Sequence, residues 1–324
     1  MKKRDHIEFG VILGLDRAMI LQQSELISAD LTYFPENSQP HIYLICKRPR
    51  ISFDPERIEI KEGLLTLGIN VQRQSSFEKH TYSMFHNWKS ENIEWDCPYP
   101  YTFLTLKPIG RKPFRIKAAA MAQIAANYTV QDDYLDLEVL YVGQAYGKDG
   151  ARTAPARILN HSTLQSIYAD VPQKNPDYEV WLILCSFFQT IVTSLDGISE
   201  SKNDFGEGQK DKLFEKLTRE GIGRRQEVNI AEAALIRYFQ PTYNVVYKWS
   251  FPKFGHQGYL ECYELGINSI TIELATVEQL NCQLYSSHTE RKHDHIFHYT
   301  LHTEEDKQNM YQFFPDFQVP GLQN

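Results

Sequence analysis

Leu140-Tyr141-Val142-Gly143-Gln144 lies near the middle of this chain, and its first three residues are the end of the apolar run 137–142. The fold prediction starts from this stretch. A second apolar run, 127–130, is separated from the first by a polar stretch. Together the two runs predict a β-hairpin. A helix is expected from Pro155 to about residue 168, because proline is favourable as a first helical residue, where its missing N–H would have no partner.

Two further elements complete the central third of the chain. Residues 178–188 are almost continuously apolar, which is typical of a strand covered on both faces. The next helix is expected to begin with Asn229 as its cap and to end by Gln240, because Pro241 cannot continue it. The order strand, strand, helix, strand, helix predicts an α+β fold, a small mixed sheet with flanking helices, embedded between β-rich N- and C-terminal regions.

The flanking regions read mostly as strands. We therefore expect a β-rich N-terminal domain at 1–112, a central domain at 113–245 with a Gly-rich polar insertion at about 196–211, and a C-terminal β-rich segment at 246–324. A short helix is predicted near 116–125. Short apolar or alternating runs predict strands at 7–15, 31–34, 41–46, 58–61, 64–71, 101–106, 270–274 and 295–302.

The composition limits the function classes. The 324 residues allow two or three domains, at roughly 100–200 residues each, and 42% hydrophobic with 23% charged residues is typical of globular proteins. No apolar run is long enough for a membrane helix. Five scattered cysteines, none in C-x-x-C spacing, favour a reduced, cytoplasmic protein without a cysteine zinc site. A net charge of −7 argues against a general nucleic-acid binder, so any basic footprint must be local.

The central third resembles the GIY-YIG nuclease domain over about 127–245. Tyr141-Val142-Gly143 stands where that family has its second signature tripeptide. The first tripeptide is not present as such, and Ala126-Asn127-Tyr128 is the best candidate for it. Arg157 and His161 match the R-x-x-x-H of the family's first helix, an i, i+4 pair that projects from one helical face.

The end of the resemblance is Glu232-Ala-Ala-Leu-Ile236 followed by Pro241 and Asn244, which is similar to the family's E-x-x-L-I…P…N. The resemblance implies a Mg²⁺- or Mn²⁺-dependent endonuclease that hydrolyses DNA, with double-stranded DNA as the expected substrate, and leaves a 5′-phosphate and a 3′-hydroxyl. The flanking β-rich regions, including 1–112, would then choose the target, as in a restriction, mobile-element or defence enzyme. The expected partners besides DNA are a second copy of the chain or a protein that delivers the DNA contact.

The resemblance also implies a role for each matched residue. Glu232 would bind the cation, which prefers oxygen ligands, and Arg157 would bind the scissile phosphate through its planar fork. Tyr128 or Tyr141 would orient or deprotonate the attacking water, with His161 as a rival base. Gly143 and Asn244 would support the site. The remaining candidates, for nucleic-acid contacts, are Lys148, Arg152, Arg224 and Arg225.

Other interpretations of these residues stay open. Asn229-Ile-Ala-Glu232 is also a plausible capping box, in which the carboxylate would reach back to the Asn229 amide. Arg152 could replace Arg157 if the preceding loop is shorter. The core could serve as a catalytically inactive binding or assembly module, which the acidic balance favours, or could act on RNA or branched DNA.

Overall fold

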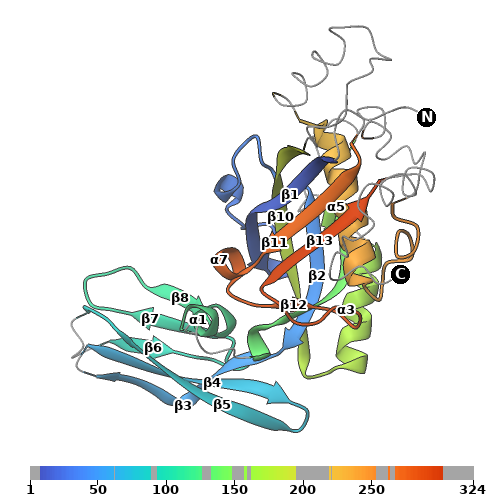
Figure 1. Cartoon of the computed structure of the whole chain (residues 1–324). Helices are drawn as coiled ribbons and strands as arrows, with labels where there is room; N and C mark the ends of the chain where they lie inside the picture. Colours follow the sequence, from blue (N-terminus) through green and yellow to red (C-terminus); the bar gives the residue numbers. More distant parts are fainter. Residues whose placement is uncertain are drawn as a thin grey trace, which may run out of the picture.

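The computed structural model describes residues 8–61, 63–88, 93–125, 133–147, 157–158, 162–194, 219, 221–252, 262 and 267–301. Within these residues the protein is mainly sheet with a few helices, and the fold is α+β, with one large mixed sheet (Figure 1). The predictions for 127–130 and for the insertion at 196–211 lie outside the described residues.

A seven-stranded sheet in the order β12-β9-β2-β10-β1-β11-β13 forms the body of the molecule. Its strands come from the N-terminal, central and C-terminal thirds of the chain, so the expected segments 1–112, 113–245 and 246–324 all contribute to one sheet. The β1–β11 and β12–β9 pairs are parallel, and the other pairs are antiparallel. The strands are β1 (Glu8–Leu21), β2 (Ile42–Pro49), β9 (Leu137–Gln144), β10 (Tyr178–Ser194), β11 (Ser269–Ala275), β12 (Leu284–Tyr285) and β13 (Asp294–Thr300).

Both faces of this sheet are covered, because successive side chains of a strand point to opposite faces. On β2, Leu44 packs in the apolar cluster that includes the buried side chains of α5 (Arg224–Phe239). Its neighbour Ile45 packs in the cluster formed with α3 (Ser162–Lys174). The continuous apolar run of β10 follows from the same two-sided burial, as predicted from its sequence.

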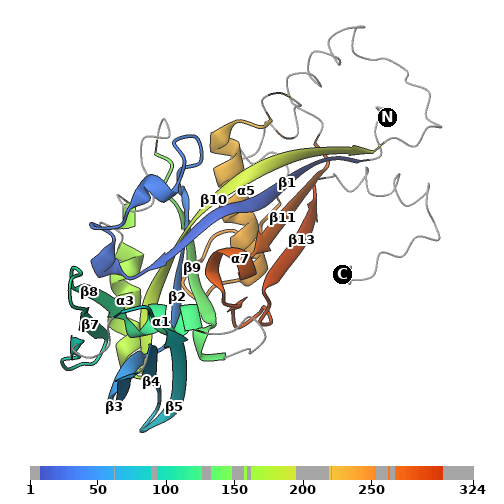
Figure 2. The same cartoon turned by 90° about the vertical axis from the view of Figure 1, so that its left-hand side faces the viewer.

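A lobe of two small sheets is inserted between β2 and β9, which are neighbours in the large sheet. Figure 1 shows this lobe projecting from one end of the body, and Figure 2 shows it from the side. Its sheets have the orders β3-β4-β5 and β6-β7-β8. The elements are β3 (Ile51–Lys61), β4 (Leu64–Arg73), β5 (Ser76–Phe85), β6 (Glu94–Asp96), β7 (Phe103–Lys107) and β8 (Phe114–Lys117), followed by α1 (Ala118–Ala125).

Where the lobe meets the body, a fully buried arginine of the body and a lysine of the lobe lie over the same indole ring. The guanidinium of Arg48, at the end of β2, lies 4.0 Å from the ring centroid of Trp181 on β10. The Nζ of Lys117 lies over the same ring at 4.7 Å. Burial lowers the pKa of Arg48, and the neighbouring Glu179 carboxylate opposes that effect. This stack of cations on an indole ties the lobe to the sheet.

Three local predictions differ from the structure. Residues 31–34 are not a strand; Leu31–Tyr33 forms the 3-10 helix η2, because the Asp30 side chain accepts a hydrogen bond from the Thr32 amide and caps it. α3 continues to Lys174, with Pro172 in its last turn, beyond the expected end near 168. α5 begins at Arg224 after Gly223, more than one turn before the expected cap at Asn229, and it ends at Phe239 with Gln240 as its cap, within the expected limit. The remaining short elements are η1 (Gln23–Glu25), η4 (Asp133–Leu135) and α7 (Val277–Leu280).

Candidate functional site

Two tyrosine rings from neighbouring strands lie over Gly143. Tyr141 and Gly143 lie on one face of β9, and Tyr43 on β2 is the register partner of Gly143. The ring centroids of Tyr43 and Tyr141 are 6.2 Å apart. A Cβ at position 143 would lie 2.6 Å from Cζ of Tyr43 and 2.7 Å from Cε1 of Tyr141. Glycine is therefore required here because it leaves the space that the two rings fill.

Arg157 approaches these tyrosines from the α3 side of the sheet. Its neighbour Ile158 is fully buried in the cluster that α3 forms with β2 and β9, which fixes the backbone at this point. Arg157 itself is exposed, and its positive charge opposes the burial that raises the pKa of the Tyr43 hydroxyl. The same guanidinium acts electrostatically on Tyr141 and on Glu232. The predicted cation thus lies beside one predicted tyrosine and the predicted carboxylate.

Glu232 is held at the end of β9 by Gln144. The Nε2 of Gln144 donates to Oε2 of Glu232 at 2.6 Å and to Oδ1 of Asn229 at 3.0 Å. Because α5 begins at Arg224, Glu232 lies in the middle of the helix, so the capping-box interpretation of Asn229 and Glu232 is wrong. Both side chains instead face the strand end, where Gln144 bridges them.

Burial dominates the electrostatics of the site. It raises the pKa of the Glu232 carboxyl to about 7, although the side-chain and backbone hydrogen bonds from Gln144 and the charge of Arg157 oppose the shift. Burial also raises the pKa values of Tyr43 and Tyr141, and the neighbouring Glu232 charge adds to both shifts. Near pH 7 the two phenols are therefore neutral, and Glu232 is divided between its neutral and ionised forms.

Asn244 fixes the segment that follows α5 against β9. The β12 strand pairs with β9 only at Leu137 and Glu138. Farther along the same strand, Asn244 takes the place of a strand partner: its Oδ1 accepts from the Val142 amide at 2.9 Å and its Nδ2 donates to the Val142 carbonyl at 2.8 Å. This buried carboxamide sets the position of β9 relative to the end of the Glu232 helix.

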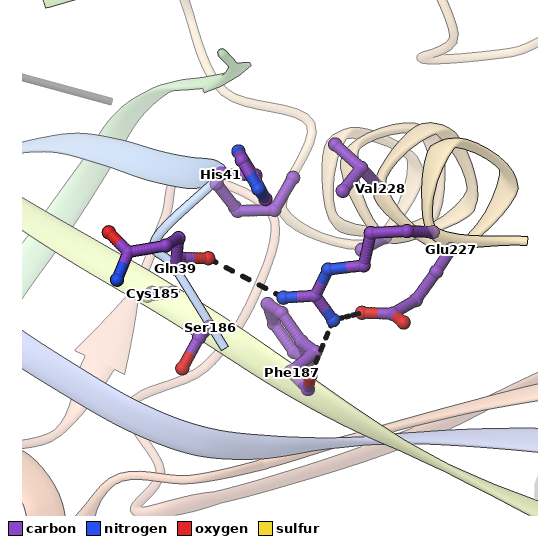
Figure 3. Close-up of a pocket in the computed structure, with 10 residues that line it drawn as sticks. Gln39, His41, Cys185, Ser186, Phe187, Glu227 and Val228 are labelled. Carbon is purple, nitrogen blue, oxygen red and sulfur yellow. Dashed lines mark hydrogen bonds and ion pairs between the residues drawn. The ribbon is translucent and has the colours of Figure 1, made fainter. Parts of the chain in front are cut away.

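Arg224 has a structural role at the start of α5. Its guanidinium donates to the carbonyl oxygens of Phe187, at 3.1 Å, and Gln39, at 3.4 Å, and pairs with the buried Glu227 carboxylate. Figure 3 shows these contacts beside a small cavity that His41 and Ser186 also line. Arg224 is thus held by three intramolecular partners, whereas the adjacent Arg225 is exposed. Four predicted site residues lie outside the described residues: Tyr128, Lys148, Arg152 and His161.

Sequence reasoning missed Tyr43 and Gln144. Tyr43 follows His41-Ile42 at the start of an expected strand, but nothing in the local pattern pairs that strand with β9, from which the whole lobe separates it. Gln144 directly follows Gly143 of the Tyr141-Val142-Gly143 tripeptide. Its polar side chain at the end of an apolar strand is the sequence feature that could have identified it as a site residue. A third addition is Tyr247, which has a φ of +68° and whose pKa is raised by burial and by the Glu232 charge.

Glu232 is the residue of this site that could hold a cation. Among the described residues, no three His, Cys, Asp or Glu side chains gather as a ready set of metal ligands. Mg²⁺ needs fewer protein ligands, because it keeps several waters and is often bound by one or two carboxylates together with substrate phosphate oxygens. The Glu232 carboxylate lies beside Arg157, which can bind a phosphate. This pair therefore suits an ion that is coordinated by one carboxylate and by the phosphate oxygens of the substrate.

The comparisons with known proteins add no relative. No protein-family model, curated protein or solved structure matches this chain. Among the described helices, none combines the length and the apolar character needed to cross a membrane. The function is therefore inferred from the geometry of the site.

Proposed function

We propose that this protein is a metal-dependent endonuclease that hydrolyses phosphodiester bonds of DNA. The observation that carries the proposal is the convergence of Tyr43, Tyr141, Arg157 and Glu232 at one end of the β2–β9 pair, over a glycine that leaves room for both rings. A carboxylate, a guanidinium and two phenols from separate elements can supply a cation ligand, charge neutralisation at the phosphate and hydrogen bonds that orient water, which are functions that phosphodiester hydrolysis needs.

The proposal keeps the GIY-YIG resemblance and changes one assignment. His41-Ile42-Tyr43 supplies the first tripeptide, in place of Ala126-Asn127-Tyr128, because β2 lies beside Tyr141-Val142-Gly143 in the sheet. The lobe and α1 are then an insertion between the two signature strands. On this assignment, the first tripeptide is absent from the residues shortly before Tyr141 because the insertion separates the two.

Each side chain has a role that its surroundings allow. Arg157 is exposed at the mouth of the cluster and binds a phosphoryl oxygen, with its planar fork neutralising charge as the bond order changes. Tyr43 and Tyr141 act as neutral hydrogen-bonding groups that orient the attacking water and the phosphate, because their raised pKa values make them poor bases at pH 7.

Glu232 is the acidic group of the site. A Mg²⁺ or Mn²⁺ ion bound there supplies charge neutralisation at the phosphate oxygens and carries coordinated water. In its ionised form the Glu232 carboxylate would hold the ion, and the hydrogen bond from Gln144 keeps the carboxylate at the strand end. In the protein without the ion, burial raises the pKa of this carboxyl to about 7, so it exchanges a proton readily at neutral pH.

A cleavage assay tests the proposal. Purified protein is incubated with supercoiled plasmid and with single-stranded DNA in the presence of Mg²⁺, Mn²⁺ or EDTA. We expect metal-dependent nicking that falls on the order of 100-fold or more in Arg157→Ala and Glu232→Gln, since each removes charge stabilisation from the transition state. The control Glu278→Gln makes the same charge change on the exposed surface of α7 and should cleave normally.

The outcomes separate the proposal from its rival. Cleavage that survives in Glu232→Gln would show that the site is elsewhere. Metal-independent DNA binding with no cleavage of any substrate would favour a catalytically inactive binding or assembly module, for which the net charge of −7 is the supporting observation.

A further inference from the structure

The β7–β8 hairpin of the lobe is a basic element in an acidic protein. Between Asp96 and Asp132 the chain has five lysines and arginines and no acidic residue, although its net charge is −7. The hairpin strands and the turn between them, 103–117, carry all five of these cations. A local excess of this kind marks where an acidic protein could meet a polyanion.

The turn of the hairpin is open around Gly110, and Arg111 at its side donates a hydrogen bond from Nη2 to Oδ1 of Asn87 at 3.5 Å. Gly110 has a φ of +73°, and a Cβ added there would meet no atom of the described residues within 4 Å. The Arg111 amide donates to the Pro108 carbonyl at 3.2 Å, which closes the turn. Ile109 is 62% exposed at the tip. A closed turn with an exposed apolar side chain is shaped to enter a groove.

Three of the five cations have no acidic partner among the residues that the structure describes. Lys107 pairs with Glu94 across the sheet, and Lys117 pairs with Glu25. Arg111, Lys112 and Arg115 are exposed and form no ion pair with any residue in the described part of the chain. The Arg115 guanidinium lies 3.7 Å from the ring centroid of Phe103, which orders it along the β8 edge. These three side chains present positive charge at the tip and the edge.

The candidate site lies at one end of β2, and the lobe that carries the hairpin follows the other end. Tyr43 is near the start of β2, and the lobe begins at Ile51, directly after the strand ends. Eight residues of β-strand span about 25 Å, and Figure 1 shows the lobe extending farther from the body. A duplex that contacts both must therefore be longer than about eight base pairs, at about 3.4 Å each.

We propose that the β7–β8 hairpin is a second contact with duplex DNA, in which Arg111, Lys112 and Arg115 bind phosphates and Ile109 enters a groove. The inference rests on the proposed nuclease function for its choice of partner. On this proposal, the inserted lobe binds a part of the duplex that is remote from the cleavage site. The second contact therefore favours double-stranded over single-stranded substrate.

Equilibrium binding in EDTA tests this contact without any cleavage. Fluorescence anisotropy of a labelled duplex of about 30 base pairs is measured between about 50 and 200 mM salt, because log K falls with log salt by about 0.9 for each phosphate contact. We expect Arg111→Ala/Lys112→Ala to reduce the slope by about 1.8 and the affinity on the order of 50-fold near 100 mM salt. Addition of Arg115→Ala should bring the loss of slope to about 2.7.

Two further variants distinguish a specific contact at the hairpin from a general effect of charge. Lys174→Ala/Lys292→Ala removes the same charge from exposed positions on α3 and beside β12, each already paired with an acidic side chain, and should leave the slope unchanged. Ile109→Ser should weaken binding at constant slope, because a groove contact releases no counterion.

An unchanged slope in the tip variants, or an equal loss in the Lys174→Ala/Lys292→Ala control, would overturn the proposal. Tighter binding of single-stranded DNA or RNA than of duplex DNA would overturn the choice of partner. The nuclease proposal is tested separately, because Glu232→Gln should abolish cleavage in Mg²⁺ while it keeps the full salt slope in EDTA.

Discussion

Glu232→Gln should alter the pH dependence of folding stability in a direction that burial determines. Burial raises the pKa of the Glu232 carboxyl from 4.5 to about 7 in the folded protein. In the unfolded chain the carboxyl loses its proton near its ordinary pKa. The folded state therefore holds one more proton between these values, and the contribution of this group to stability is complete below about pH 4.5 and is lost as the pH rises through about 7.

The size of the effect follows from the shift. Each pKa unit corresponds to about 1.36 kcal/mol, so a shift from 4.5 to about 7 has a ceiling of about 3 kcal/mol. Glu232 keeps some solvent contact, which reduces this value, and we expect a change of about 1–3 kcal/mol. In Glu232→Gln the new side chain does not titrate, and its amide oxygen can still accept the hydrogen bond from Gln144. The variant should gain stability relative to the natural sequence as the pH rises.

Urea unfolding in EDTA, followed by circular dichroism, measures the free energy of unfolding of both proteins at about pH 5 and about pH 8. Glu278→Gln, which replaces an exposed carboxyl on α7, is the control and should show no such trend. If the difference between Glu232→Gln and the natural sequence changes by less than about 0.5 kcal/mol over this range, the carboxyl is solvated in solution. The argument that burial controls the charge of the site would then fail.

Three further changes test individual contacts. Gly143→Ala should lower the free energy of unfolding by about 1–3 kcal/mol, because its Cβ would lie 2.6 Å from Tyr43 Cζ. In a double-mutant cycle of urea unfolding, Tyr43→Ala should recover part of this loss. Strict additivity of the two changes would contradict the contact. Asn244→Ala should lower the free energy of unfolding by about 1–3 kcal/mol, since the Val142 amide and carbonyl lose their partner; an unchanged melting temperature would argue against this role. Burial lowers the pKa of His295 from 6.5 to about 4, so its contribution to stability is lost as the pH falls from about 6.5 towards 4, and His295→Gln should flatten the acid side of the stability curve. Parallel curves for variant and natural protein would contradict this.

The sequence by itself determined the local elements around the site. The apolar runs that form β9 and β10 are visible as such, and Pro241 sets the end of α5 because it cannot continue a helix. The start of α5 is not visible, because Gly223 is a weak cap signal and Asn229 offers a stronger one. Residues 31–34 resemble a strand because a short apolar run does not distinguish a strand from a single helical turn.

Only the tertiary structure decided which of these elements meet. Tyr43 reaches Gly143 because β2 pairs with β9 across an excursion through the whole lobe, and pairing between distant strands depends on burial and register that no local pattern records. The bridge from Gln144 to Glu232 and the raised pKa of that carboxyl arise where a strand end meets the middle of a helix. The sequence specifies the types of the site residues, whereas the distances between them and their charge states result from packing.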